Sequence, residues 1–97
     1  MGVTSICKPA PIPYITEGMV ISVYFRDEYG QNPKKISIHD ENTLKKAIEM
    51  YQEQINKSGL SVRKAIYEPD QTTLPLGKKL KDLEINFLNT IIVYFCG

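Results

Sequence analysis

Residue types that carry out catalysis or bind metals are scarce in this sequence of 97 residues, which has one histidine and two cysteines. His39 could act as a base for Cys7 or Cys96, but both cysteines lie near a chain end and in no recognisable catalytic motif. The spacing of histidine, cysteine and carboxylate residues fits no metal site. The glycines are isolated from one another, so no phosphate-binding loop is predicted. We therefore expect no catalytic residue, no metal and no cofactor, and a protein that is not an enzyme.

An excess of charge and long apolar segments are also absent. The net charge of +1 gives no general reason to expect nucleic acid or a membrane surface as a partner. No apolar run approaches the roughly 20 residues of a membrane span, and the first residues lack the basic and apolar regions of a signal peptide. Without a CxxC motif, the two cysteines are expected to be free thiols. These observations predict a cytoplasmic or nuclear protein that contacts no membrane and for which nucleic acid is an unlikely partner.

Proline is concentrated at the start of the chain. Pro9, Pro11 and Pro13 alternate with other residues, which prevents a helix and removes hydrogen-bond donors from any strand ladder. We therefore expect an extended proline-rich N-terminal arm over residues 1–18. The remaining residues, 19–97, are enough for one domain with one core.

Two segments with a period of two follow the arm. Met19, Ile21, Val23 and Phe25 fall on one face of a predicted strand, and residues 26–33 have the composition of a turn in which Gly30 suits a positive φ. The second strand has Ile36 and Ile38 facing inward and Lys35, Ser37 and His39 facing outward. Further strands are predicted over residues 63–68, near residues 74–76, and over residues 90–95. The last of these is a nearly unbroken β-branched and aromatic run, which is typical of a central strand.

A helix is predicted from Thr43 to Lys57. Its apolar residues recur at the helical spacing and form a single stripe, and Asn42 or Thr43 can cap its start. Gly59 suits the left-handed position after the last turn, with Leu60 folding back onto the helix. Residues 80–85 suit one short helical turn packed on the core. The predicted core comprises Ile21, Val23, Phe25, Ile36, Ile38, Leu44, Ile48, Tyr51, Ile55, Leu60, Leu83, Ile85, Ile91 and Val93.

The order of these elements and several short motifs resemble ubiquitin and SUMO over residues 19–95. The motifs are Phe25-Arg26-Asp27 before the first turn, Leu44-Lys45-Lys46 with Tyr51 on the helix, Gly59-Leu60-Ser61 after it, and Leu80-Lys81-Asp82-Leu83-Glu84-Ile85-Asn86 before the last strand. The resemblance implies an α+β fold of the ubiquitin-like β-grasp type, with a mixed sheet packed on one main helix. Its first and last strands would be parallel neighbours.

The resemblance also implies a function, because small domains of this fold usually bind other proteins and catalyse nothing. The first expectation is a non-enzymatic protein–protein interaction module, the N-terminal ubiquitin-like domain of a larger scaffold or adaptor. One alternative is a free ubiquitin-like modifier conjugated through Gly97, although the sequence ends Cys96-Gly97 without the flexible Gly-Gly tail of ubiquitin and SUMO. A second is a ribonucleoprotein component, because similar patterns occur in a ubiquitin-like protein of the minor spliceosome.

The outer face of the predicted sheet is the first candidate for a binding site. Alternation places Val20, Tyr24, Ile66, Ile92 and Tyr94 together on this face. By the resemblance, Ile66, Ile92 and Tyr94 match strand positions with which ubiquitin binds its receptors, and Tyr29 matches a loop position. A contiguous apolar patch is usually a contact site. Three occupants remain open: a protein partner, the N-terminal arm, and a second copy in a homodimer.

The groove between the second strand and the helix is the second candidate. We expect Lys35, Ser37, Lys45 and Lys46 to border it. A SUMO-like domain binds an extended hydrophobic and acidic peptide in this place by adding a strand to the sheet edge.

Overall fold

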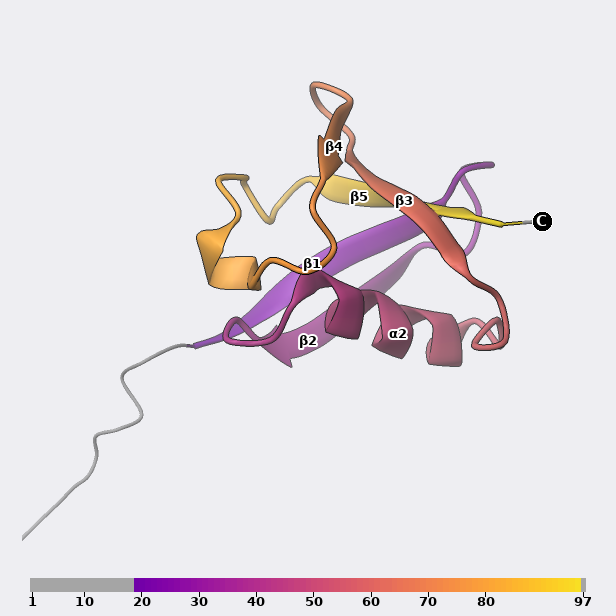
Figure 1. Ribbon diagram of the computed structural model, residues 1–97, viewed down its shortest axis with the longest axis horizontal. Coiled ribbons are helices and arrows are strands. Elements are labelled where there is room, and N and C mark those ends of the chain that lie inside the picture. Colours follow the sequence, from indigo (N-terminus) through magenta and orange to yellow (C-terminus); the bar gives the residue numbers. More distant parts are fainter. Residues whose placement is uncertain (1–18, 97) are drawn as a thin grey trace, which may run out of the picture.

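The computed structural model describes residues 19–96, which form a mixed sheet with a helix across one face (Figure 1). The elements are β1 (Val20–Asp27), β2 (Lys34–His39), α2 (Leu44–Gln54), β3 (Val62–Tyr67), β4 (Thr72–Leu74), the 3₁₀ helix η2 (Leu80–Asp82) and β5 (Thr90–Phe95). The predicted N-terminal arm, Cys7 and Gly97 lie outside the described residues. Within residues 19–96, no helix is long and apolar enough to cross a membrane.

The five strands lie in the order β2-β1-β5-β3-β4. β1 is antiparallel to β2 and parallel to β5, with Phe25 opposite Ile91. β5 is antiparallel to β3, and β3 is antiparallel to β4. This order confirms the predicted β-grasp arrangement, with the first and last strands as parallel neighbours and the last strand in the centre of the sheet.

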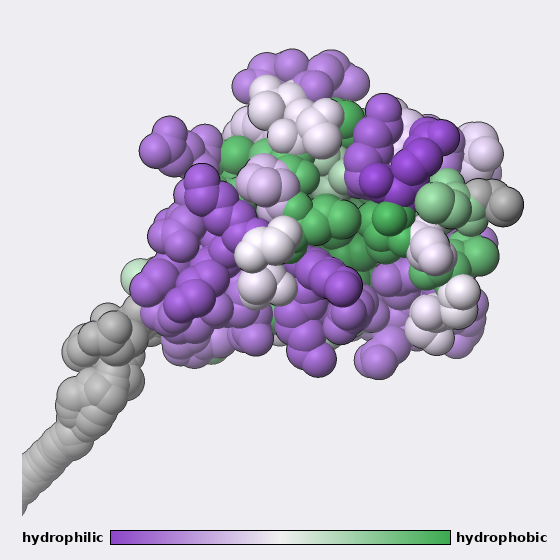
Figure 2. Space-filling model, viewed as in Figure 1, coloured by the Kyte–Doolittle hydropathy of each residue, from purple (hydrophilic) through white to green (hydrophobic). Residues whose placement is uncertain are grey.

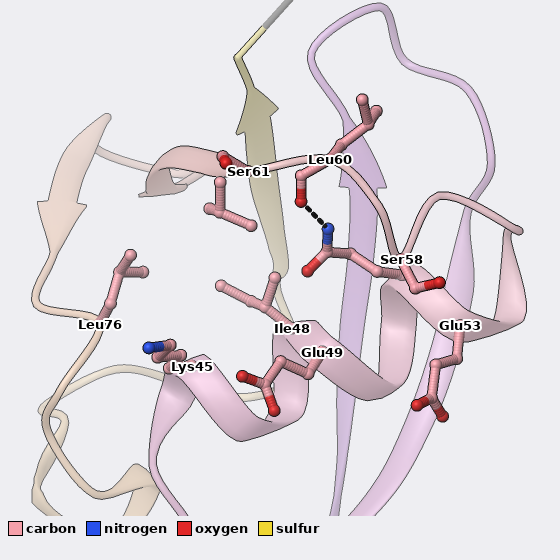
Figure 3. A pocket seen from close by; sticks show the side chains of 10 residues that line it. Lys45, Ile48, Glu49, Glu53, Ser58, Leu60, Ser61 and Leu76 are labelled. Carbon is pink, nitrogen blue, oxygen red and sulfur yellow. Dashed lines mark hydrogen bonds between the residues drawn. The ribbon is translucent and has the colours of Figure 1, made fainter.

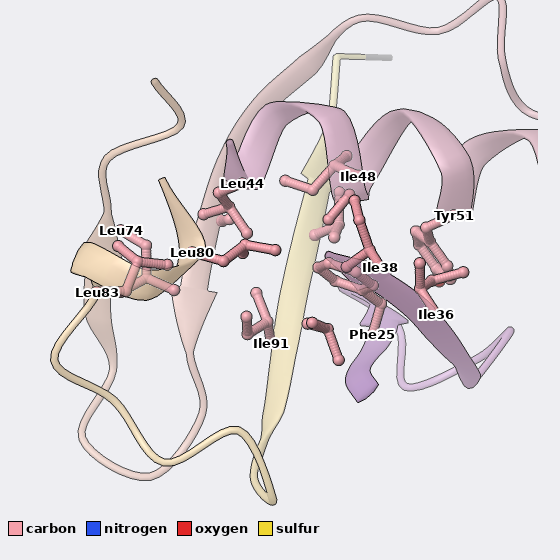
Figure 4. Packing of buried hydrophobic residues seen from close by; sticks show 14 residues of the cluster. Phe25, Ile36, Ile38, Leu44, Ile48, Tyr51, Leu74, Leu80, Leu83 and Ile91 are labelled. Carbon is pink, nitrogen blue, oxygen red and sulfur yellow. The ribbon is translucent and has the colours of Figure 1, made fainter. Parts of the chain in front are cut away.

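Alternation along the strands fixes which side chains face the helix. Val23 and Phe25 of β1 and Ile91 and Val93 of β5 are at most 1% exposed and belong to the core (Figure 4). In β3, Ala65 is in the core cluster, whereas its neighbour Ile66 is buried outside it. The inward and outward faces of β1, β3 and β5 are therefore those that the sequence predicts.

The core lies between the sheet and α2, whose Leu44, Ile48 and Tyr51 are at most 1% exposed (Figure 4). The Tyr51 ring stacks on Phe25 at 5.2 Å between centroids, and its hydroxyl donates a 2.8 Å hydrogen bond to the Asn32 carbonyl. Three residues of the predicted core are only half-buried at its border: Ile21, Ile55 and Ile85. Four others complete the core: Ala47, Ala65, Leu74 and Leu80.

The end of α2 differs from the prediction. The helix begins after Thr43, whose hydroxyl accepts the Lys46 amide at 3.2 Å, and ends at Gln54 rather than Lys57. Asn56 takes the left-handed conformation with φ 59°, so the assignment of that position to Gly59 is wrong. The Lys57 amide donates to the Gln52 carbonyl at 2.8 Å, which closes the helix as a Schellman motif.

Because the helix closes early, the chain between α2 and β3 is longer than predicted. Leu60 lies in this connection and is 40% exposed, so its placement in the core is wrong. Its carbonyl accepts a 2.7 Å hydrogen bond from the Gln52 side chain. Leu60 is therefore tied to α2 through its backbone, and its side chain stays partly in solvent.

Candidate functional site

Ile66 and Ile92 form the centre of the outer sheet face. They are register partners across β3 and β5 and lie on the side of the sheet that faces away from α2. Alternation predicts their direction correctly, but Ile66 is only 6% exposed and Ile92 only 4%. The expectation that these two side chains form an open apolar patch is therefore wrong.

A pair of long charged side chains from the neighbouring strands lies on the same face as the two isoleucines. Arg26 of β1 is the register partner of Ile92, and its Nη2 atom lies 3.0 Å from Oε2 of Glu68, just beyond β3. Because β5 lies between β1 and β3, the ion pair bridges the central strand over the isoleucines. The Arg26 and Glu68 side chains are themselves 26% and 44% exposed, so the cover is at the surface.

Two tyrosines flank the isoleucine pair, and cations lie beside each of them. Tyr94 is half-buried, and Lys64 Nζ lies 4.9 Å from its ring centroid and Arg63 Cζ 5.5 Å away, within the range of cation–π contacts. A bulge between Val62 and Lys64 interrupts the alternation of β3, which lets two consecutive side chains reach the same ring.

Tyr24 occupies the other side of the outer face. It is half-buried and is the register partner of the exposed Lys35. Tyr24, Arg26, Lys34 and Lys35 line a shallow hollow of about 250 Å³. The outer face therefore combines an apolar centre and two half-buried tyrosines with several basic side chains and one acidic side chain, Glu68.

Tyr29 lies apart from this group, in the turn between β1 and β2, and is 79% exposed. The buried Asp27 carboxylate holds the turn by accepting the Tyr29 amide at 2.9 Å and the Gln31 amide at 2.7 Å. Gly30 has φ 76°, as the composition of the turn predicts. Tyr29 lines a hollow of about 260 Å³ that also contains Leu60, at one end of the sheet.

The residues of the second candidate groove are not brought together. Lys35 and Ser37 lie on β2, which is an edge strand, and both are exposed. Lys45 lines a groove on the opposite flank of α2, facing β3. The grouping of Lys45 with the β2 edge is therefore wrong.

The groove between α2 and β3 is a feature that the sequence did not predict. It has a volume of about 700 Å³, and Ile48, Val62 and Leu76 are among the residues that line it (Figure 3). Figure 2 shows hydrophobic surface gathered in this hollow, between α2 and β3. The exposed side chains of Glu49 and Glu53 stand on its helical wall.

Hydrogen bonds donated by the Gln52 side chain hold the loop that forms the Leu60 end of this groove. Its Nε2 atom donates to the carbonyls of Lys57 at 3.1 Å and Leu60 at 2.7 Å. Gln52 is 5% exposed, so these bonds are shielded from solvent. In the sequence, the sign of this anchor is a glutamine next to the apolar stripe of the helix, and it was not used for the prediction.

Titratable groups outside these surfaces hold loops in place. Glu41 accepts hydrogen bonds from Lys81 at 2.7 Å and Lys79 at 3.2 Å, and these bonds lower the pKa of its carboxyl group. A hydrogen bond from Thr72 lowers the pKa of Asp70 in the same way. Across residues 19–96, no three histidine, cysteine or carboxylate side chains are grouped as metal ligands. Cys96 is an exposed free thiol and His39 is exposed on β2.

Comparison with known proteins finds a solved structure with the same fold, but no family to which the chain can be assigned. No family model and no curated protein matches the sequence. Among solved structures, the crystal structure of the UBL domain of Plasmodium falciparum Dsk2 is similar, with a TM-score of 0.60 and 18% sequence identity. The match covers 80% of this chain and 100% of that one. The chain therefore has the ubiquitin-like β-grasp fold that its sequence predicts.

Proposed function

We propose that this chain is a non-enzymatic protein-interaction module within a larger cytoplasmic or nuclear scaffold or adaptor, and that it binds a partner through the outer face of its sheet. The observation that carries the proposal is the Ile66–Ile92 pair at the centre of that face, flanked by Tyr24 and Tyr94. The ubiquitin-like fold supports the class, because domains of this fold are typically non-catalytic protein binders.

The cover over the isoleucines is weak enough for a partner to displace it. Arg26 and Glu68 are both partly exposed, and ion pairs of this kind contribute up to about 1 kcal/mol. Burying the uncovered apolar surface against a partner contributes a binding free energy of roughly 25 cal/mol per Å². Separating Arg26 from Glu68 therefore costs a partner at most about 1 kcal/mol, which the burial of about 40 Å² of apolar surface offsets.

The charge around this face selects the partner. Arg26, Lys35, Arg63 and Lys64 lie beside the tyrosines or the isoleucine pair. Complementary charge speeds association and favours one class of partner. We propose that the partner presents apolar side chains together with aspartate or glutamate. Added salt then weakens binding, because the charges are at the surface.

Alanine substitution of Tyr24 and Tyr94 tests the proposal. Proteins retained by the immobilised chain from a eukaryotic lysate are identified by mass spectrometry, and the affinity of the recovered partner is then measured for each variant. Each tyrosine variant should lose about tenfold or more, since aromatic residues at the centre of an interface carry much of the binding energy. Both rings are partly exposed, so the variants keep the fold.

Lys78→Ala is the matched control, because Lys78 is an exposed residue between β4 and η2, outside both candidate binding surfaces. It should bind the partner as the unchanged chain does. Equal binding by the tyrosine variants and the control would contradict the proposal. So would a ladder of covalent conjugates that disappears when Gly97 is removed, because that result identifies a conjugated modifier.

A further inference from the structure

The strand β3 has an open edge along its first half. β4 pairs only with residues Ala65–Tyr67, so Val62 and Lys64 are paired with β5 alone. The Ser61 carbonyl accepts the Cys96 amide at 2.9 Å and so points toward β5. Because successive residues of a strand direct their backbone groups to opposite sides, the amide and carbonyl of Val62 point to the open edge.

The open edge lies against the groove between α2 and β3. Ile48 forms its buried floor, Val62 and Leu76 are half-buried at its sides, and Leu60 is 40% exposed at one end (Figure 3). After β4, the chain turns toward the helix, where the Leu76 carbonyl accepts the Lys45 amide at 2.9 Å. This turn keeps the groove open beside the first half of β3.

Two carboxylates on the helical wall of the groove make no ion pair with any residue in the described range 19–96. Glu49 and Glu53 lie one helical turn apart on this flank of α2, and both are exposed. Lys45 lies one turn before Glu49, near Leu76. The groove therefore has an acidic end toward Ser58 and a basic residue at the opposite end.

We propose that this groove binds an extended peptide that contains an apolar residue and a lysine or arginine two positions away. The peptide adds a strand to the open edge of β3 and forms main-chain hydrogen bonds with Val62. Alternate side chains of the added strand point toward α2, so the apolar side chain lies over Ile48 and the basic one between Glu49 and Glu53.

This site is independent of the outer sheet face. It lies on the side of the sheet that carries α2, and its carboxylates favour a basic ligand, whereas the outer face has more basic than acidic side chains. One chain could therefore hold two protein segments of opposite charge at the same time. Failure at either site leaves the other unaffected.

Titration of the full chain with synthetic peptides tests this proposal. The probe is a short peptide of valine, threonine and lysine, blocked at both ends, in which valine and lysine are two positions apart. We expect the backbone amide signals of Val62 to Lys64 to shift in nuclear magnetic resonance spectra, and hydrogen exchange at the Val62 amide to slow. A peptide with glutamate in place of lysine should bind about threefold to tenfold more weakly.

Two further measurements identify the binding mode. A probe with N-methylated alternate residues lacks the main-chain donors and should lose most of the affinity. The double variant Glu49→Lys, Glu53→Lys should prefer the glutamate peptide, whereas Glu84→Gln, at an exposed residue outside the groove, should behave as the unchanged chain does.

Several results would overturn the proposal. One is unchanged Val62 to Lys64 signals at saturating probe, which would mean that the groove is closed to peptides, for example because residues 1–18 of the same chain fill it. Another is equal binding of the lysine and glutamate peptides. A third is full affinity of the N-methylated probe. A concentration-dependent shift of the same signals without any peptide would assign the groove to a second copy of the chain.

Discussion

The centre of the outer sheet face is apolar and buried, whereas the groove beside α2 is open and is lined by both apolar and charged side chains. Ile92 is 4% exposed, on a face where Arg26 and Glu68 meet across the central strand, whereas Leu60 at the groove is 40% exposed. Strand alternation gives the direction of a side chain. Its exposure depends instead on the length and charge of the neighbouring side chains and on where adjacent strands end.

The largest expected effect is at the floor of the groove. Ile48 is 1% exposed and belongs to the core as well as to the groove. We expect Ile48→Ala to lower the free energy of unfolding by about 2–4 kcal/mol, through lost burial and the cavity that remains. Urea denaturation measures this change. A loss below about 1 kcal/mol would show that the groove floor collapses, and that the open groove is not a rigid feature.

A smaller loss is expected at the centre of the outer face. Ile92→Ala should lower the free energy of unfolding by about 1–2 kcal/mol, because the surface side chains above it can move inward and fill part of the cavity. Ile91→Ala on the inward face of the same strand is the matched control and should cost more, since Ile91 is fully buried. Equal losses in urea denaturation would mean that the cover is as rigid as the core.

The sequence predicted the elements and their faces well, because both follow from local periodicity. Val23, Phe25, Ile91 and Val93 alternate with outward residues, and the structure buries all four. The groove was missed because it depends on where β4 stops pairing with β3. Pro75 marks the end of β4, since it has no amide to donate, but it does not show what lies beside the unpaired part of β3. The cover on Ile92 was missed because Arg26 and Glu68 are 42 residues apart in sequence.

The flank of α2 opposite the groove is closed by a partly buried hydrogen bond, so it can be compared with the open flank. Tyr51 is fully buried, and its hydroxyl donates to the Asn32 carbonyl. Tyr51→Phe should lower the free energy of unfolding by about 1 kcal/mol, because the carbonyl loses its partner. Denaturation at neutral pH measures this change, and an unchanged stability would mean that water replaces the hydroxyl.

The same residue makes stability depend on alkaline pH. Burial, with a smaller contribution from the Asp27 carboxylate, raises the pKa of Tyr51 from 10.0 to about 12. Below pH 10.0 both the folded and the unfolded chain keep this proton, so the full stability is present. Between pH 10.0 and about 12 the unfolded chain releases the proton first, and stability falls as pH rises. Tyr51→Phe should show a shallower fall over this range.

A gain is expected in the loop at the end of the groove. Gly59 has no atom within 4 Å of the position of an added Cβ, and unlike Asn56 it has no positive φ. Gly59→Ala should raise the free energy of unfolding by about 0.5 kcal/mol by restricting the unfolded chain. Asn56→Gly is the companion variant and should be neutral or slightly stabilising, since glycine accepts the left-handed conformation more readily. Destabilisation by Gly59→Ala would show that the loop requires glycine at position 59.

The smallest effect on stability is expected at the cover itself. Glu68→Gln removes the charge that holds Arg26 across β5, and the Glu68 side chain is 44% exposed. The free energy of unfolding should change by less than about 0.5 kcal/mol, because exposed ion pairs are largely screened by solvent. Denaturation in low and high salt should give nearly the same difference between the variant and the unchanged chain.

The same substitution should have a larger effect on access to the isoleucines. Once Arg26 is released, the methyl groups of Ile66 and Ile92 should become more accessible to a soluble paramagnetic probe, while those of Ile91 stay protected in the core. The outer face would then resemble the open groove in exposure without a comparable loss of stability. If the Ile92 methyl groups stay protected, the strands and the tyrosines bury them without help from the ion pair. The difference in exposure between the outer face and the groove would then come from the strand arrangement and not from the charged side chains.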